Sequence, residues 1–338
     1  MSEYPVLRFG VVGLDHRHIF DQVRGLLDIG GECAGYWTEG HPLPEKGFIE
    51  RFPHIPRVDD RARLFEDPTV RLITCAAIPC DRAALAVEAM RCGKDFMADK
   101  PGMTTLEQLD AIRQTQRQTG RIYSVNFTEH FEVRAVTTAT ELVRSGAIGR
   151  VIQTLGLGPH RFNRHTRAPW FFDPKAYGGI LADIGSHQIE QFLHFTASDD
   201  ARIVLARCGN LGHPDDPGFQ DFGEMVLTHE GANGYVRLDW FTPDSLGAWG
   251  DGRFMILGTE GYIELRKYID IAGRSGADHL FLVNHGETRY IDCSRAELPY
   301  YSDLRRDVFE RTETAMTHAH CFKTCELALT AQAMAARI

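Results

Sequence analysis

The chain has 338 residues, of which 43% are hydrophobic and 25% are charged, and its formal net charge is -9. The length suggests two domains, and the composition is that of a globular protein without an apolar run long enough to cross a bilayer. The acidic balance argues against nucleic acid as a partner. The eight cysteines are scattered without C-x-x-C pairs, which indicates reduced thiols, and no signal peptide is recognised, so a cytoplasmic protein is expected.

Strands alternate with helices over the first 125 residues. A further helix is expected to begin at Thr104, because Thr104 and Glu107 have the spacing of a capping box. The order of elements predicts an α/β domain of the Rossmann type, with a doubly wound parallel sheet, over residues 1–125. Its strands are predicted from the apolar runs at 6–12, 32–37, 71–78, 96–98 and 121–127, and its first helices from the periodic segments at 19–27 and 81–93.

The turn after the first strand lies where dinucleotide-binding folds carry the fingerprint G-x-G-x-x-G. The sequence there is GLDHRH from Gly13, so Asp15 and His18 stand at the second and third glycine positions. Asp15 would place a negative charge beside the pyrophosphate unless it caps the following helix. In that case His16, Arg17 and the backbone amides would face the anion.

The second strand is followed by Thr38, where an acidic residue usually binds the adenosine ribose of NAD. A threonine hydroxyl tolerates a ribose hydroxyl or a 2'-phosphate. No arginine lies next to Thr38 to pair with that phosphate, so the sequence favours NAD weakly over NADP.

Two short motifs carry the residues best suited to catalysis. Lys100 follows the apolar run 96–98, which places a lysine at the carboxyl end of a strand, where open α/β sheets bind their ligands. The second motif is GGILADIGSHQIEQ at 178–191. Read as a helix, it puts Asp183 and His187 four residues apart on one face, so that a carboxylate and an imidazole share a pocket.

Together these motifs resemble the Gfo/Idh/MocA family of nicotinamide-dependent oxidoreductases, which includes glucose-fructose oxidoreductase and inositol dehydrogenase. The family's E-K-P is present as Asp99-Lys100-Pro101, and its G-G-x-L-x-D-x-G-x-H is intact at 178–187. The resemblance covers essentially the whole chain and implies a catalytic set of Lys100, Asp183 and His187. It implies reversible hydride transfer between NAD or NADP and a secondary hydroxyl of a sugar or polyol, and a cis Lys100–Pro101 peptide bond.

We expect His187 to be the general base, because the ordinary pKa of an imidazole lies near neutrality, with Lys100 polarising the developing alkoxide and Asp183 orienting substrate and imidazole. Lys100 as the base is the nearest variant. The Thr-Pro that borders the nicotinamide in the family is present here as Ile78-Pro79. The residues expected to contact the cofactor are Gly13, Leu14, Asp15, His16, Arg17, Thr38, Ile78, Pro79, Asp99 and Lys100.

Residues 126–338 are predicted to form an α+β domain for substrate binding and oligomerisation. Helices on one side of its sheet would leave a face, expected to carry Leu238, Trp240 and Phe241, that a homodimer or homotetramer would cover. The segment from residue 302 is expected to be a long helical stretch that can pack back on the first domain. A large, mostly antiparallel open sheet is predicted from the β-rich runs at 150–157, 202–208, 221–229, 233–241, 253–267 and 279–293.

The loop after the first of these strands is expected to overhang the pocket. Its candidate substrate contacts are His160 and Arg161 as hydrogen-bond donors and Trp170 as a platform for a sugar ring. No metal site is predicted. Two other functions stay open: a metal-dependent lyase or isomerase using Asp183, His187 and His160 as ligands, and a binding protein that has lost the cofactor.

Overall fold

The computed structural model describes residues 4–338, which form two compact units. The first unit contains the chain up to Asn126, together with Thr166–Gly178 and Pro299–Cys325. The second contains Phe127–His165, Gly179–Leu298 and Glu326–Ile338. Two segments of the first unit therefore come from the part of the chain beyond the boundary expected near residue 125.

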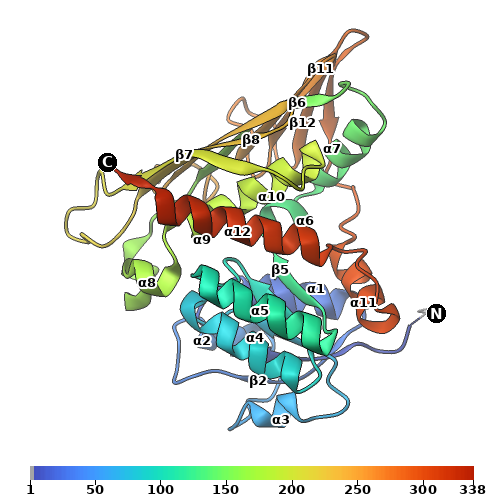
Figure 1. Cartoon of the computed structure of the whole chain (residues 1–338), viewed down its shortest axis with the longest axis vertical. Coiled ribbons are helices and arrows are strands. Elements are labelled where there is room, and N and C mark those ends of the chain that lie inside the picture. Colours follow the sequence, from blue (N-terminus) through green and yellow to red (C-terminus); the bar gives the residue numbers. More distant parts are fainter. Residues whose placement is uncertain (1–3) are drawn as a thin grey trace. The chain divides into compact units, whose positions relative to one another are not determined.

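The first unit is built on a five-stranded parallel sheet with the order β2-β1-β3-β4-β5. The order reverses between β1 and β3, which makes the sheet doubly wound and creates a switch point at its carboxyl edge. The predicted fold is therefore confirmed (Figure 1). The strands are β1 (Arg8–Val12), β2 (Glu32–Trp37), β3 (Leu72–Cys75), β4 (Asp95–Asp99) and β5 (Tyr123–Asn126).

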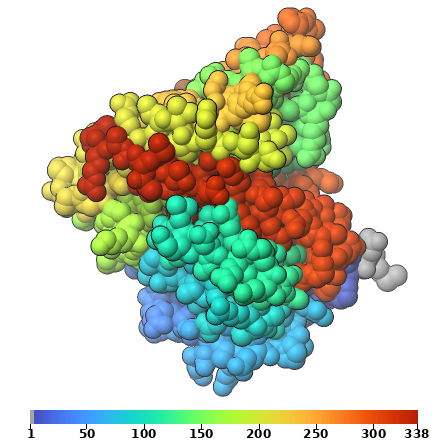
Figure 2. Space-filling model, in the orientation of Figure 1, coloured from blue at the N-terminus to red at the C-terminus, as the bar shows by residue number. Residues whose placement is uncertain are grey.

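The helices of the first unit follow the predicted segments closely, with one change at a cap. The capping residue of helix α5 is Thr105, one residue later than expected, because the Thr105 hydroxyl accepts the Gln108 amide and Gln108 Oε1 accepts the Thr104 amide. The capping-box spacing fits both threonines, so sequence alone does not select one. The exposed side of α5 forms part of the blue-green surface in Figure 2. The helices are α1 (Ile19–Asp28), α2 (Glu45–Arg51), α3 (Ala62–Phe65), α4 (Arg82–Arg91), α5 (Leu106–Thr119), α8 (Pro174–Tyr177) and α11 (Tyr300–Glu310), with short 3-10 turns at Pro79–Asp81 and Pro169–Phe172.

The second unit is built on a nine-stranded sheet with the order β13-β12-β11-β10-β6-β9-β8-β7-β14. Among the described strands of this sheet, only the β6–β9 and β7–β14 pairs are parallel, so the predicted open, mostly antiparallel sheet is confirmed. Its strands are β6 (Val151–Pro159), β7 (Arg202–Gly209), β8 (Phe222–His229), β9 (Ala232–Asp239), β10 (Arg253–Gly258), β11 (Gly261–Arg266), β12 (His279–Asn284), β13 (Thr288–Asp292) and β14 (Ala336–Arg337).

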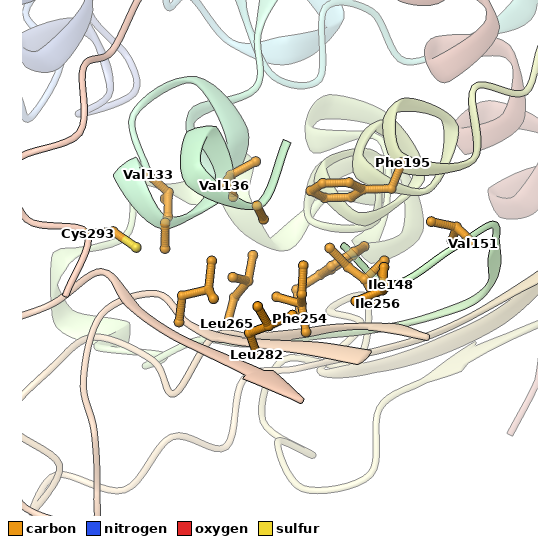
Figure 3. Packing of buried hydrophobic residues seen from close by; sticks show 14 residues of the cluster. Val133, Val136, Ile148, Val151, Phe195, Phe254, Ile256, Leu265, Leu282 and Cys293 are labelled. Carbon is orange, nitrogen blue, oxygen red and sulfur yellow. The ribbon is translucent and has the colours of Figure 1, made fainter. Parts of the chain in front are cut away.

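Helices α7 (Arg134–Arg144) and α10 (Gly185–Thr196) cover one face of this sheet. Figure 3 shows the resulting core, in which Phe195 of α10 and Val136 of α7 lie against Phe254 and Leu282 of the strands. Two single-turn helices, α6 (Thr128–Phe131) and α9 (Ile180–Asp183), precede α7 and α10. The buried helix face and the inward strand positions thus hold α10 in place.

The opposite face of the sheet carries other residues than those expected. Leu238 is fully buried and Trp240 is 5% exposed, and only Phe241 is substantially exposed. Leu238 lies on the helix side, because a Cβ built at Gly185 of α10 would meet its Cδ1 at 3.1 Å. The expectation for Leu238 and Trp240 is therefore wrong, and the outward positions of β10 are Met255 and Leu257.

The carboxyl-terminal segment contains two helices, since α11 ends at Glu310 and α12 runs from His318 to Met334. Arg311 adopts a left-handed conformation at the end of α11, which stops that helix. Within residues 4–338 no helix has the length and apolarity to cross a membrane.

Two leucines of α5 allow a test of how this helix is stabilised. Leu109 is fully buried, whereas Leu106 is 40% exposed on the same helix. We expect Leu109→Ala to lower the free energy of unfolding by about 2–5 kcal/mol, because a buried cavity remains. Leu106→Ala should change it by less than about 0.5 kcal/mol. Urea unfolding of both variants checks this, and equal losses would contradict the packing of α5.

Candidate functional site

The turn after β1 retains the one glycine that its geometry requires. Gly13 has φ +81°, and a Cβ there would lie 2.4 Å from the Cβ and 2.7 Å from the backbone nitrogen of Ala77. Its amide donates to the Trp37 carbonyl, and the Leu14 amide donates to the Thr38 hydroxyl at 3.2 Å. The β1 turn and the end of β2 are therefore fixed together at the carboxyl edge of the sheet, and Gly13 packs directly against Ala77.

Asp15 does not cap helix α1. The helix begins at Ile19 and its N-cap is His18, without a side-chain cap, so the capping role expected for Asp15 is wrong. The Asp15 carboxylate instead accepts a hydrogen bond from the amide of Ile78. Burial raises the pKa of Asp15 to about 6, although Arg82 lowers it in part. Asp15 therefore changes charge in the range where enzymes are commonly assayed.

Asp99 is the centre of a polar network that joins three strand ends. Its carboxylate is fully buried and accepts from His18 Nδ1 at 2.8 Å and from the Arg82 guanidinium at 3.0 Å, while His16 Nδ1 lies 3.1 Å away. Burial raises the pKa of Asp99, but His18 and Arg82 outweigh it and hold the pKa well below its usual value. Burial, with His18 beside it, lowers the pKa of His16 to about 3, so His16 stays neutral.

Arg82 fixes the backbone around Lys100. Its guanidinium donates to the carbonyls of Asp99, Lys100 and Pro101 at 2.7–2.9 Å, and its side chain is fully buried. The Lys100–Pro101 bond is cis, as predicted, and Lys100 is only 4% exposed. Sequence reasoning missed Arg82 and the role of His18, because nothing local marks an arginine at the start of a helix as buried.

The second motif forms the end of α9 and the start of α10. Gly178 and Gly179 have φ of 90° and 84°, which lets the chain enter α9. A Cβ at Gly179 would also lie 2.2 Å from the Gln332 side chain. Asp183 closes α9 and His187 lies in the first turn of α10, and they are 8% and 2% exposed. The structure therefore places Asp183 and His187 on consecutive helices of the second unit, so the single helix read from 178–191 is wrong, and it places Lys100 in the first unit.

A buried ion pair supports α10 directly beside His187. Lys267 is 1% exposed and donates to Glu129 Oε2 at 2.8 Å, and the Gln188 amide donates to the same oxygen at 3.0 Å. Gly156 of β6 leaves room for Gln188, since a Cβ there would lie 2.7 Å from Gln188 Cγ. The network connects α6, α10 and the end of β11. No local sequence motif marks this network, because Glu129 and Lys267 are 138 residues apart in the chain.

The expected substrate residues are divided between the units. Arg161 donates to the carbonyls of Leu246 and Ala248, at 2.5 and 2.9 Å, so its guanidinium holds the loop after β9. His160 lies between two tryptophans, with ring centroids 5.0 Å from Trp240 and 4.5 Å from Trp249. Trp170 belongs to the first unit. Their contact with substrate stays a prediction.

Two groups of histidine and carboxylate side chains converge among residues 4–338. One is His16, His18 and Asp99, and the other is His130, Glu190 and His194. The carboxyl-terminal histidines and cysteines do not form such a group within the described residues: His318 pairs with Glu313 at 2.8 Å.

Two features of the β1 turn bear on how a dinucleotide would fit there. Gly13 keeps a close approach to Ala77 that a Cβ would block, and Asp15 is turned toward Ile78. A charged Asp15 nevertheless remains next to this turn and opposes a diphosphate.

Comparison with known proteins places both units in one group. Residues 8–127 match the model described as oxidoreductase family, NAD-binding Rossmann fold, and residues 136–264 match the GFO/IDH/MocA C-terminal domain. A crystal structure from Erwinia carotovora atroseptica SCRI1043, of a protein proposed to be an oxidoreductase, is 47% identical with a TM-score of 0.95 and covers 98% of this chain and 99% of that one.

Two curated relatives are more distant. Levoglucosan dehydrogenase of Pseudarthrobacter phenanthrenivorans is 24% identical over 205 residues, which are 60% of this chain and 52% of that protein. The NAD(+)-dependent scyllo-inositol 2-dehydrogenase of Bacillus subtilis is 23% identical over 259 residues, 74% of this chain and 71% of its own. The chain thus spans about half the length of the first relative and somewhat more of the second.

The position of Asp15 makes a pH-dependent affinity testable. Because Asp15 is neutral below pH about 6 and charged above it, affinity for NADH should fall as pH rises from 5 to 7.5, by about fivefold, or roughly 1 kcal/mol of repulsion. Asp15→Asn should remove the pH dependence and bind as tightly as the parent does at pH 5.

Fluorescence titration of NADH across this pH range measures the effect. The matched control is Asp21→Asn, which removes an exposed carboxylate in the first turn of α1 and should keep the parent's profile. An Asp15→Asn variant that loses binding at every pH would show that the carboxylate contributes to binding.

Proposed function

Because the chain belongs to the Gfo/Idh/MocA family of NAD-binding oxidoreductases, we propose that it transfers hydride between a nicotinamide cofactor and a secondary hydroxyl of a sugar, polyol or related small molecule. The observation that carries the proposal is the intact motif of the second unit, which puts a buried carboxylate and a buried imidazole at the junction of α9 and α10. Two relatives that share this family are named for dehydrogenation of levoglucosan and scyllo-inositol.

The cofactor site is assigned to the carboxyl edge of the parallel sheet. The start of α1 suits a diphosphate, and Thr38 suits the adenosine ribose, with NAD favoured weakly over NADP. Ile78, Pro79 and the Asp99–Lys100 turn lie at the neighbouring strand ends. When bound, the nicotinamide supplies the carbon that accepts or returns the hydride.

The protein's own residues handle the proton and the developing charge. His187 Nε2 or Nδ1 accepts the hydroxyl proton of the substrate, since a neutral imidazole is the side chain best suited to this near neutral pH. The Lys100 ammonium stabilises the alkoxide as it forms, and Asp183 orients the imidazole and the substrate hydroxyl. Each of these three side chains is buried, which strengthens its own charge interactions.

Substrate contacts outside this set are assigned to His160 and Trp170, with Arg161 holding the loop after β9, whose Trp249 packs against His160. An imidazole between two tryptophans and a further tryptophan provide the flat apolar surfaces and the hydrogen bonds that sugar rings use. This assignment suits polyhydroxylated rings.

Replacement of His187 tests the proposal. His187→Asn should lower kcat by about 100-fold or more while changing the Kd of NADH less than about threefold, because the general base is lost and the cofactor site is not. Lys100→Met should have a similar effect on kcat. Reduction of NAD and NADP, followed at 340 nm with a panel of sugars and inositols, provides the assay.

The control for this experiment is His285→Asn, which replaces an exposed histidine of the β12–β13 turn and should leave kcat unchanged. Full turnover in His187→Asn would remove the proposed base. If the protein binds NADH but no compound of the panel reduces NAD or NADP, a binding protein is favoured. Activity that depends on added metal would favour a lyase or isomerase.

We further propose that the outer face of the nine-stranded sheet joins two copies of the chain. Met255, Leu257 and Tyr262 on adjacent strands are each 37–38% exposed, and a hollow of about 570 Å³ lies on the same face beside Arg237 and Arg253. Apolar side chains spread over neighbouring strands favour burial against a matching surface.

Light scattering after gel filtration checks this assembly. The parent should elute as a dimer or tetramer, and Met255→Arg combined with Leu257→Arg should produce monomers, because two charges per chain would be buried. Leu211→Arg, at a 57% exposed loop position, is the control and should not change the mass. A monomeric parent would rule out the interface.

A further inference from the structure

A second polar cluster lies deeper along the helix that carries His187. Glu190 is 1% exposed, and both of its carboxylate oxygens lie 2.9 Å from Nδ1 of His130 on α6. His194 stands one turn further along α10, and its ring centroid is 4.3 Å from that of His130. One ligand atom from each of the three side chains lies within 4.8 Å of the other two.

The ring of His194 is held by a neighbour on α7. The Thr140 hydroxyl lies 2.9 Å from the Val136 carbonyl and 2.7 Å from His194 Nε2. With its proton given to the carbonyl, the hydroxyl oxygen accepts from Nε2. In the neutral imidazole Nδ1 then carries the lone pair. A hydrogen bond from the ring nitrogen opposite the metal-binding one is what fixes the tautomer and orientation of metal-ligating histidines.

The other histidine cluster differs in charge. In the group of His16, His18 and Asp99, the Arg82 guanidinium already neutralises the carboxylate at 3.0 Å. Arg82 completes that cluster and opposes a second cation. The contacts described around Glu190, in contrast, come from imidazole.

From these contacts we infer that His130, Glu190 and His194 form a binding site for a divalent transition-metal ion, with Zn²⁺ as the best match. Two imidazoles and one carboxylate are a common ligand set for Zn²⁺, with metal–ligand distances of about 2.0–2.2 Å. The ligand atoms of a tetrahedral Zn²⁺ ion are about 3.4 Å apart. The three ligand atoms here lie within 4.8 Å of one another, so small side-chain rotations would bring them to that distance.

The ion would stabilise the second unit by linking α6 to α10. The site does not include Asp183 or His187. The role of the ion is therefore to stabilise the packing of α10, which carries His187, and it takes no part in proton transfer. A proton shared between His130 and Glu190 engages two of the three converging side chains. The metal uses all three side chains.

Metal content and Co²⁺ spectroscopy test the site on the full chain. Protein stripped with a chelator and dialysed against Zn²⁺ should retain about one equivalent and melt at a higher temperature than the stripped form. Co²⁺ should give the visible absorption of a four-coordinate site. Glu190→Gln and His194→Asn should each weaken Zn²⁺ binding by about 100-fold or more and abolish the Co²⁺ absorption.

His18→Asn, in the other cluster, and the exposed His285→Asn are the matched controls, and both should retain the full equivalent. Stripped parent protein that takes up less than about a tenth of an equivalent and gives no Co²⁺ absorption overturns the proposal. So does full Zn²⁺ retention in Glu190→Gln. Metal uptake by the parent protein decides the question even if one of the variants fails to fold.

Discussion

Asp99 is a buried anion, and the groups that pair with its carboxylate hold the strand ends of the first unit together. His16 and His18 reach it from the β1 turn, and Arg82 reaches it from the start of α4. An unpaired carboxylate at this depth would cost several kcal/mol. Because Arg82 also binds three carbonyls around Lys100, the same ion pair determines where the lysine backbone lies.

This network explains why two departures from the family pattern occur together. Asp99 replaces the glutamate of E-K-P, and His18 replaces the third glycine of the fingerprint, and these two side chains bind each other at 2.8 Å. Asp15, at the second glycine, is held by the Ile78 amide. Gly13 alone is required by sterics, since Ala77 fills the space that a Cβ would need. At this turn, hydrogen-bonded side chains therefore occupy two positions where the fingerprint has glycines.

The second unit solves a similar problem beside His187. Glu129, Gln188 and Lys267 are buried together between α6, α10 and the end of β11. Such a network restrains α10 in direction as well as position, because hydrogen bonds have preferred angles and apolar contacts do not. A helix held in this way can present the His187 imidazole from its first turn, next to Asp183 at the end of α9, without relying on a mobile loop.

The sequence by itself determined the elements whose signals are local. Apolar and β-rich runs predicted both sheets, and the glycines at 178 and 179 marked the entry to a helix, because residue patterns and positive φ are properties of neighbouring residues. The motifs located Lys100, Asp183 and His187 in the chain. Only the tertiary structure decided that Leu238 faces the helices, since the two faces of a strand differ by a shift of one residue. It alone revealed Arg82 and Lys267 as buried cations, because the partners that make such burial possible are brought close by folding and not by sequence.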